Sequence, residues 1–549
     1  MNLFAKIISK VSKNERLVMA LAFAISLITS LIVLSSRPFL QGTGDTSTYV
    51  SLSKEIMLNG LIIPRTNTIH YPGSVWVYPP IFPYMGALII STTRAQGLDQ
   101  YVVLALVGSF IFSLTSIPVY LLLREMYGNS VAFLGATIYP FFLPSLYILS
   151  WGGYPQLLGF LLTSIIIYYV TKAERLGKNR TRYALYSGLA LGMLALSHDL
   201  TFVLIFLSVI ILIIYRLIIR VTAGTAGSRS IKVPLISVLI SSVFGAYWYA
   251  PRIWWVKDSA FPTSSPEFLK YSVGIPSSSG IMQDLGSDIF SLQQPLGPLS
   301  MFVFIFALYV VLLFFLIFKM RGELRQNRKI DFAYIIMLVA LVLSLLEFKD
   351  PVLFVRLFYF VLFTGFIVAI NPLYYGVKEL MKSSTRIGSY SREITVRRIA
   401  GYAIILLVLL NAVTGLSFNY ESHTFYGSDT GNASLDVQSM GLLNFVHKNL
   451  SGQAVIAAPV PLAFDIMGYA GNPVLAFQPS NYLTQPVEWA ENYAAYIMIY
   501  NSSQNVSYTD SLIHEYNVSY VIIPAHTQGI DPSYSVVYIS QYFILFRVP

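Results

Sequence analysis

The chain is organised around residues 41–56, which read QGTGDTSTYVSLSKEI. This segment opens a polar stretch, about residues 37–100, that interrupts an otherwise nearly continuous series of apolar runs. Asp45 follows a flexible Gly-X-Gly turn, and Tyr49, Leu52 and Ile56 then recur at the spacing of one face of a short helix. We therefore expect an acid at the start of an amphipathic helix that can lie at the membrane interface.

The composition excludes an ordinary soluble protein. Of the 549 residues, 55% are hydrophobic and only 11% are charged. Apolar runs of about 15–23 residues recur over the first three quarters, and most are long enough to cross a hydrocarbon core of roughly 30 Å as a helix, whereas barrel strands would be shorter and alternating. The predicted spans, about eleven, are Leu17–Ser35, Tyr101–Leu123, Val131–Leu149, Gln156–Thr171, Tyr183–Ser197, Thr201–Arg220, Val233–Ala250, Leu299–Lys319, Asp331–Phe348, Val352–Ile370 and Ile399–Leu416. The fold class is therefore mainly α, a polytopic membrane bundle.

The orientation depends on Pro80–Thr93, which is apolar but too short for a full crossing and is predicted to be re-entrant or interfacial. With a cytoplasmic N-terminus, this reading leaves 25 of the 36 Lys and Arg residues inside and 19 of the 26 acids outside. Because the formal charge of +10 segregates by side, it does not indicate a nucleic-acid partner. The absence of cysteine excludes disulfides and cysteine metal sites. We predict an integral plasma-membrane protein with the bilayer as its first partner.

Residues 418–549 differ in kind from the membrane module, residues 1–417 with outer loops 36–100 and 251–298. They are polar, rich in Tyr, Ser and Asn, and long enough for a small domain. A helix over Met440–Leu450 and several short strands predict an extracytoplasmic α/β unit. The predicted strands are Ala454–Ala458, Ser519–Pro524, Val536–Ile539 and Phe543–Val548. Five Asn-X-Ser sequons are glycosylation candidates on that face: Asn432, Asn449, Asn501, Asn505 and Asn517.

Signatures of soluble enzymes, such as a P-loop, a Rossmann fingerprint or HExxH, are missing, and polar residues gather instead at the outer face. The order of these features resembles the GT-C superfamily of integral-membrane glycosyltransferases. The resemblance rests on Gly44-Asp45, a helix ending near Asn59-Gly60, a juxtamembrane helix opening at residues 78–83, and the end of a span at residues 122–128. A narrower similarity, to prokaryotic 6-pyruvoyl-tetrahydropterin synthase-related membrane proteins, rests on residues 151–156 and 197–198.

The GT-C resemblance implies a polyprenyl-phosphate-linked sugar donor, an outer-face acceptor (a glycan, lipid or protein) and a carboxylate base. Asp45 suits that base, because glycosyl transfer to a hydroxyl needs a carboxylate within reach of the attacking oxygen. Asp45 could also simply cap the following helix, and the two roles can coexist. GT-C enzymes often carry a second acid in the next outer loop, but residues 151–155, WGGYP, contain none.

His198 and Asp199 form a candidate auxiliary catalytic pair, with an interfacial cap as the structural alternative. One His-Asp pair falls short of a metal site, so no metal ligand and no certain cofactor are assigned, while a divalent cation could still take part. Arg356 lies a few residues inside a span, where an arginine is costly and usually faces a cavity or a partner. It could bind the donor phosphate, or it could snorkel or pair with Glu347 or Asp350.

Four further residues are assigned to substrate binding. Arg252, at the start of the second long outer loop, could help to cover a lipid-filled groove, although Arg and Trp also form routine interfacial belts. His70, Tyr78 and Tyr154 lie beside turns that would shape the cavity.

Two other classes of function stay open. A non-catalytic descendant of the same scaffold would bind a glycan or lipid within a cell-envelope complex, and the missing second acid favours it. A secondary transporter would need inverted repeats and helices broken near the midplane, and ranks last.

Overall fold

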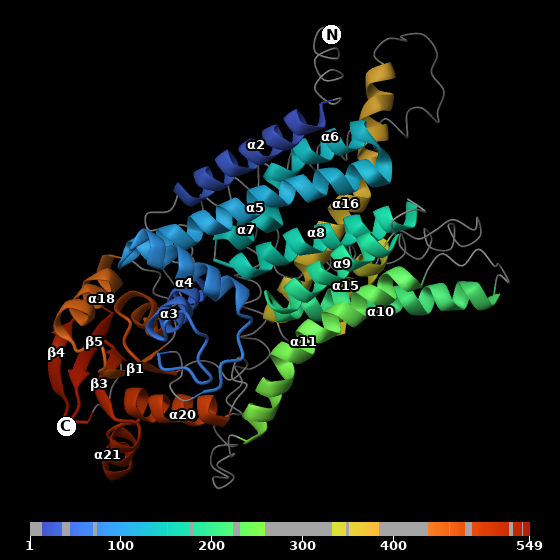
Figure 1. Cartoon of the computed structure of the whole chain (residues 1–549). Helices are drawn as coiled ribbons and strands as arrows, with labels where there is room; N and C mark the ends of the chain where they lie inside the picture. The colour runs from blue at the N-terminus through green and yellow to red at the C-terminus, as the bar shows by residue number, and fades with distance from the viewer. Residues whose placement is uncertain are drawn as a thin grey trace.

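The computed structural model describes most of the membrane module and most of the C-terminal domain (Figure 1). The described residues are 14–35, 44–69, 74–150, 152–175, 180–222, 231–258, 332–346, 351–383, 437–459, 462–477, 486–504, 506–525, 531–540 and 542–549. The predicted spans Leu299–Lys319 and Ile399–Leu416, and the predicted domain boundary near residue 418, lie outside these residues.

The membrane module is a bundle of apolar helices. Its helices are α2 (Glu15–Ser35), α5 (Leu98–Tyr127), α6 (Asn129–Ile138), α7 (Leu143–Ser150), α8 (Tyr154–Arg175), α9 (Arg180–Ala195), α10 (Asp199–Thr222), α11 (Lys232–Asp258), α15 (Phe332–Leu346) and α16 (Pro351–Ser383). Among the described helices, α2, α5, α8, α10, α11 and α16 are long and apolar enough to cross a membrane. The chain is therefore an integral membrane protein with the predicted, mainly α fold.

One predicted span, Val131–Leu149, is wrong as a single helix. The structure divides it into α6, a 3₁₀ turn over Tyr139–Phe141, and α7. Pro140 and Pro144 lack the backbone N–H that a continuous helix needs, and each ring would clash with the preceding turn. Aromatic packing compensates for the break, because the Tyr139 ring stacks on Phe112 of α5 with centroids 5.4 Å apart.

The first loop forms two helices, α3 (Gly44–Leu58) and α4 (Ile81–Thr93). Helix α4 has 13 residues, about 20 Å of helix, and so has the short length predicted for Pro80–Thr93. Helix α3 departs from expectation. Its apolar residues Tyr49, Leu52 and Ile56 are buried as predicted, but Ser51, Ser53 and other polar residues on its remaining faces are buried as well. Helix α3 is thus enclosed by protein and does not lie on a membrane surface.

Helix α11 continues past the predicted end of its span at Ala250. Arg252, Trp254 and Trp255 belong to its last turns, so the prediction that a loop begins at residue 251 is wrong. Pro251 does not end the helix. The Arg252 side chain accounts for part of this continuation, because its Nη1 donates to the carbonyl of Trp248 one turn earlier.

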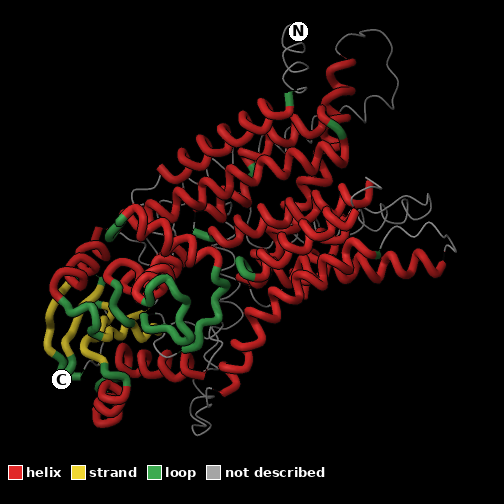
Figure 2. The backbone as a smooth tube through the Cα atoms, in the orientation of Figure 1, coloured by secondary structure: helices red, strands yellow, loops and turns green. Residues whose placement is uncertain are grey.

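The C-terminal domain is the predicted α/β unit and lies at one end of the bundle, beside α3 and α4 (Figures 1 and 2). Its elements are α18 (Val437–Asn449), β1 (Val455–Pro459), α19 (Leu462–Asp465), the π-helical turn η3 (Ile466–Ala470), β2 (Val474–Phe477), α20 (Pro486–Tyr500), α21 (Val506–Glu515), β3 (Val518–Pro524), β4 (Ser535–Ile539) and β5 (Phe543–Arg547). The helical segments α19, η3, α20 and α21 and the strand β2 were not predicted.

The five strands form one mixed sheet in the order β2-β1-β3-β5-β4. Strand β1 pairs in parallel with β2 and β3, whereas β5 runs antiparallel to β3 and β4. Alternating residues divide its two faces: Val521 and Ile523 pack with α20 and α21, while Ile522 belongs to the cluster that runs through α18, α19 and η3 to the membrane module. The sheet is thereby linked to the bundle through α19 and η3, which contact α3.

Candidate functional site

Asp45 and Arg356 form an ion pair across 311 residues of sequence. Asp45 lies in the first turn of α3 and Arg356 in the second turn of α16, with Oδ2 and Nη2 3.3 Å apart. Each side chain keeps 31% of its surface exposed, so a ligand can contact both members of the pair. Burial raises the pKa of the Asp45 carboxyl above its ordinary value, and the Arg356 guanidinium offsets part of that rise.

Two tyrosines, Tyr49 buried and Tyr78 partly buried, border this pair. Tyr49, one turn after Asp45 on α3, and Tyr78, just before α4, meet edge to face with ring centroids 6.0 Å apart, and their hydroxyls are hydrogen-bonded to each other. Burial raises the pKa of both phenols well above the ordinary value, and the charge of Asp45 raises it further. Both tyrosines therefore remain neutral beside the carboxylate, and because their mutual bond uses the proton of one hydroxyl, the other hydroxyl is left to donate.

His198 has a defined role at the start of α10. Its Nδ1 accepts the backbone N–H of Thr201 at 3.2 Å and lies 2.8 Å from the Thr201 hydroxyl. An acceptor Nδ1 leaves the ring proton on Nε2. Burial lowers the His198 pKa to about 4, Asp199 opposes that shift, and Arg356 adds to it. At neutral pH His198 is thus an uncharged cap whose Nε2–H is a donor, as the structural alternative predicted, and it lies in the electrostatic field of Arg356.

Asp199 lies in the first turn of α10 and is exposed. Its Oδ1 accepts the N–H of Leu200 at 2.9 Å, and its charge reaches the Tyr78 phenol, which also senses Asp45 and Arg356. Tyr78 therefore borders both acids.

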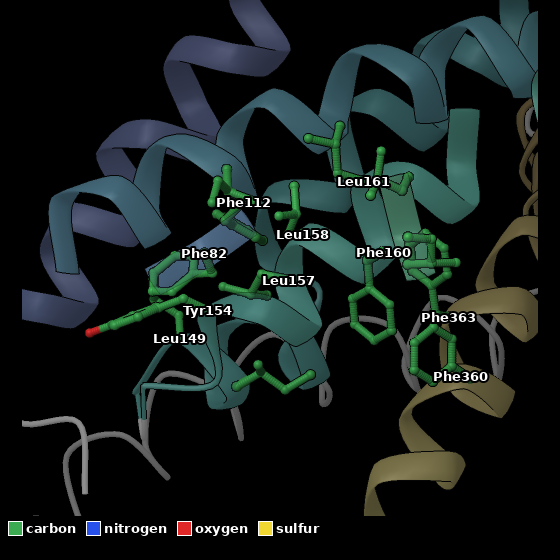
Figure 3. Close-up of a cluster of buried hydrophobic side chains, with 14 of the residues drawn as sticks. Phe82, Phe112, Leu149, Tyr154, Leu157, Leu158, Phe160, Leu161, Phe360 and Phe363 are labelled. Atoms are coloured by element: carbon green, nitrogen blue, oxygen red, sulfur yellow. The ribbon is translucent and has the colours of Figure 1, made fainter. Parts of the chain in front are cut away.

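Tyr154, the first residue of α8, supports the pair from the bundle side. Figure 3 shows its ring among buried apolar side chains, near Phe82 and Leu157, with the hydroxyl pointing out of that cluster. The hydroxyl lies 3.4 Å from Thr46 Oγ1, beside Asp45. Gln156 Nε2, also on α8, donates to the carbonyl of Arg356 at 3.2 Å. One turn later, the Phe160 ring of α8 packs against Phe360 and Phe363 of α16. Helix α8 therefore braces both members of the ion pair.

Arg252 is buried and structural. Its Nε donates to the carbonyl of Trp76 at 2.9 Å, and its guanidinium lies over the Trp248 ring. These bonds tie the end of α11 to the first loop. Glu55 anchors the same loop from α3, because its Oε1 accepts the backbone N–H groups of Thr68 and Ile69. In the structure, Arg252 therefore holds the first loop in place. Its predicted contact with a substrate stays a prediction.

The other predicted positions divide by where they fall. His70, Asn432 and Asn505 lie outside the described residues. Asn449 and Asn517 are exposed on the C-terminal domain, and Asn501 is partly buried. Asp350 and Glu347, the alternative partners of Arg356, also lie outside the described ranges.

The part of the chain that is described contains no group of three or more His, Cys, Asp or Glu side chains placed to hold a metal ion. A divalent cation therefore stays a prediction. Three residues at the site were not predicted as site residues: Thr46, Tyr49 and Gln156. Tyr49 carried a signal, since it lies one helical turn after Asp45, but Gln156 could be found only once α8 and α16 were known to be neighbours.

Comparisons with known proteins bear on the fold. No protein-family model matches the chain, and no curated protein matches it by sequence. Among solved structures, the oligosaccharyltransferase AglB of the archaeon Archaeoglobus fulgidus, in complex with an inhibitory peptide and a dolichol-phosphate, is 14% identical, with 92% of this chain and 69% of AglB covered and a TM-score of 0.57. ArnT from Cupriavidus metallidurans, bound to undecaprenyl phosphate, is 13% identical, with 96% and 97% covered and a TM-score of 0.54.

These likenesses give the chain a GT-C-like fold, as the resemblance implied. The narrower similarity to the pterin synthase-related membrane proteins finds no support.

Proposed function

We propose that the protein is a glycosyltransferase that moves a sugar from a polyprenyl-phosphate-linked donor to a hydroxyl-bearing or amide-bearing acceptor at the outer membrane face. The observation that carries this proposal is the Asp45–Arg356 pair, which sets a carboxylate and a guanidinium side by side where the first-loop helix meets the bundle. The fold shared with proteins solved with dolichol-phosphate and undecaprenyl phosphate supports a lipid-phosphate donor.

In the proposed reaction, the phosphate of the donor engages Arg356, whose planar guanidinium suits phosphate oxygens. Neutralising Arg356 removes the positive charge that lowers the basicity of Asp45, so donor binding itself strengthens the base. Asp45 then accepts the acceptor's proton as the acceptor attacks the anomeric carbon. The bond between that carbon and the phosphate oxygen breaks, and the lipid phosphate leaves with the electron pair.

His198 and the tyrosine pair supply donors to this site without carrying charge themselves. The Nε2–H of neutral His198 can hydrogen-bond an oxygen of the departing phosphate or of the sugar. Preorganised donors of this kind favour the transition state because they need no rearrangement as charge develops. Asp199, at the mouth of the site, is an auxiliary acid.

The test uses purified protein in nanodiscs with radiolabelled polyprenyl-phosphate sugars, scored for release of the lipid phosphate and for a glycosylated product. The wild type should turn over, and Asp45→Asn should lose turnover while retaining the melting temperature. Asp99→Asn, at the start of α5, is the matched control. Full turnover by Asp45→Asn would remove Asp45 from the mechanism.

The orientation proposed for this function puts the site and the C-terminal domain outside. Because the chain has no cysteine, single cysteines report sidedness cleanly. In intact cells a membrane-impermeant maleimide should label Lys448→Cys on α18, and it should label Arg182→Cys at the start of α9 only after permeabilisation. The reverse pattern contradicts the orientation.

The second candidate, a non-catalytic glycan-binding or lipid-binding subunit, is favoured by one observation: Gly152 and Gly153 occupy the loop before α8, where a second acid would be expected. It predicts saturable binding of a lipid-linked sugar that depends on Arg356 but not on Asp45, with no product.

A further inference from the structure

The C-terminal domain contacts α3 through a buried hydrogen bond two residues after Asp45. Ser47 Oγ donates to Oδ1 of Asp465 at 2.6 Å and lies 3.0 Å from the hydroxyl of Tyr101 on α5. Ser47 and Asp465 are both buried. One polar contact therefore joins α3, the bundle and the C-terminal domain.

A second contact lies two turns further along α3. Lys54 Nζ donates to the carbonyls of Gly468 and Tyr469, the latter at 3.1 Å. These carbonyls end the π-helical turn η3, where a helix leaves carbonyls without partners of its own, and a cation there is favourable. Lys54 therefore caps an element of the other domain. The backbones also touch, because a Cβ at Gly468 would come within 2.9 Å of the Cα of Ser47.

We propose that Asp465 and the carbonyls of η3 hold α3 in the position at which Asp45 meets Arg356, so that Ser47, Lys54 and Asp465 are positioning residues for the site. The proposal rests on the proposed function for its catalytic consequence. The physical basis of the positioning does not depend on that function. The C-terminal domain holds α3 at Ser47 and at Lys54, and Asp45 lies in the same turn as Ser47.

The consequence is that displacement of the domain would shift the carboxylate. An error of about 1 Å in the placement of a catalytic group can cost on the order of 100-fold in rate. The Asp45–Arg356 distance of 3.3 Å is already at the outer limit for a direct bond, so small movements of α3 matter. A ligand or partner that binds the C-terminal domain and shifts it can thus change the position of the Asp45 carboxylate.

The first readout is kinetic. Ser47→Ala and Lys54→Met should each lower kcat for sugar transfer by about 10- to 100-fold while the KM for the donor stays within about 2-fold, because Arg356 is untouched. Lys54→Arg, which still donates, should keep wild-type kcat. The controls are Lys448→Met, an exposed lysine on α18, and Asp531→Asn, a buried acid that bonds Ser533 within the domain.

The second readout does not use activity. Spin labels at Leu58→Cys, on the exposed end of α3, and Lys448→Cys, on α18, report the distance between α3 and the domain. Ser47→Ala and Lys54→Met should broaden that distance distribution, and Asp531→Asn should not. Unchanged distances in both variants would overturn the proposal whatever the chemistry turns out to be. Broadened distances with unchanged kcat would overturn the positioning role alone.

The pH dependence of the same distance adds a signature. Burial raises the Asp465 pKa to about 7, with the Ser47 bond opposing the shift. Asp465 holds its proton more tightly when the domain is docked on α3 than when the carboxyl is exposed to solvent. Docking therefore weakens as pH rises from about 4, the pKa of an exposed carboxyl, to about 7. The titratable groups around it are Lys54 from α3, Tyr101 from α5, and Tyr469 with His447 behind it, while β1 and β2 offer only apolar residues. In Asp465→Asn the distance should no longer depend on pH in this range, and a dependence equal to the wild type's would remove Asp465 from the device.

Discussion

Replacing Arg356 with methionine tests the electrostatic core of the proposed site. At a separation of 3.3 Å, a pair of unit charges interacts by about 1 kcal/mol in water and about 5 kcal/mol at an effective dielectric constant of about 20. Because each side chain is 31% exposed, solvent screening favours the lower part of this range. Loss of the guanidinium should therefore raise the Asp45 pKa, with the carboxylate form disfavoured by about 1–3 kcal/mol.

The sign follows from the charge. Arg356 favours the carboxylate form, so removing it leaves burial unopposed, and a smaller fraction of Asp45 is deprotonated at a given pH. The assay is the pH profile of kcat/KM for sugar transfer, whose acid limb reports the base of the free enzyme. In Arg356→Met that limb should move to higher pH, which lowers kcat/KM on its acid side by about 10- to 100-fold.

Two further variants isolate the effect. Arg356→Lys keeps the charge, so its acid limb should stay within about half a unit of the wild type while the KM for the donor rises, because an ammonium cannot bind phosphate in the bidentate manner. Arg216→Met removes an arginine paired with Glu174 at the other end of the bundle and should leave the limb in place. An acid limb that stays fixed, or moves to lower pH, in Arg356→Met would refute the coupling.

Three other variants address the scaffold. Glu55→Ala strands two backbone N–H groups of the first loop and should lower the free energy of unfolding by roughly 2–4 kcal/mol, with Glu55→Gln costing less, as measured by denaturant titration in detergent. Gly108→Ala would overlap the Tyr154 ring and should cost about 1–3 kcal/mol and reduce turnover, whereas Gly245→Ala, with its nearest neighbour 3.5 Å away, should be tolerated. His198→Ala loses the cap of α10, about 1 kcal/mol, and His198→Asn should restore that stability in a thermal melt without restoring turnover, which needs the Nε2–H.

Much of the fold follows from apolar patterning, because a bilayer admits few ways to satisfy a backbone. The positions of most helices, the short α4 and the α/β character of the tail come from run length and alternation alone. Asp45, His198 and Arg356 are predicted at one end of the bundle because an even number of membrane crossings separates them in the sequence. Two residues separated by an even number of crossings lie on the same side of the membrane. This count holds only if Pro80–Thr93 does not cross.

Tertiary contacts account for the features that the sequence does not predict. The break at Pro140 is visible in the sequence, but hydropathy averaged over a window hides it. The acids near Arg356 in the sequence are Glu347 and Asp350, whereas the structure supplies Asp45 from 311 residues away. The Ser47–Asp465 bond spans 418 residues, and no periodicity within either segment predicts it.

The helix directions at the site explain why its acids are few. Helices α3, α8 and α10 begin at this end of the bundle, and so does α16, whose second turn carries Arg356. Each N-terminus adds partial positive charge. Asp45 and Asp199 use the first turns of α3 and α10, while α8 opens with Tyr154 after two glycines and keeps its positive end uncancelled. A carboxylate in that loop would offset the charge that a departing phosphate requires, so the missing second acid is compatible with a site whose electrostatics come from helix ends and one arginine.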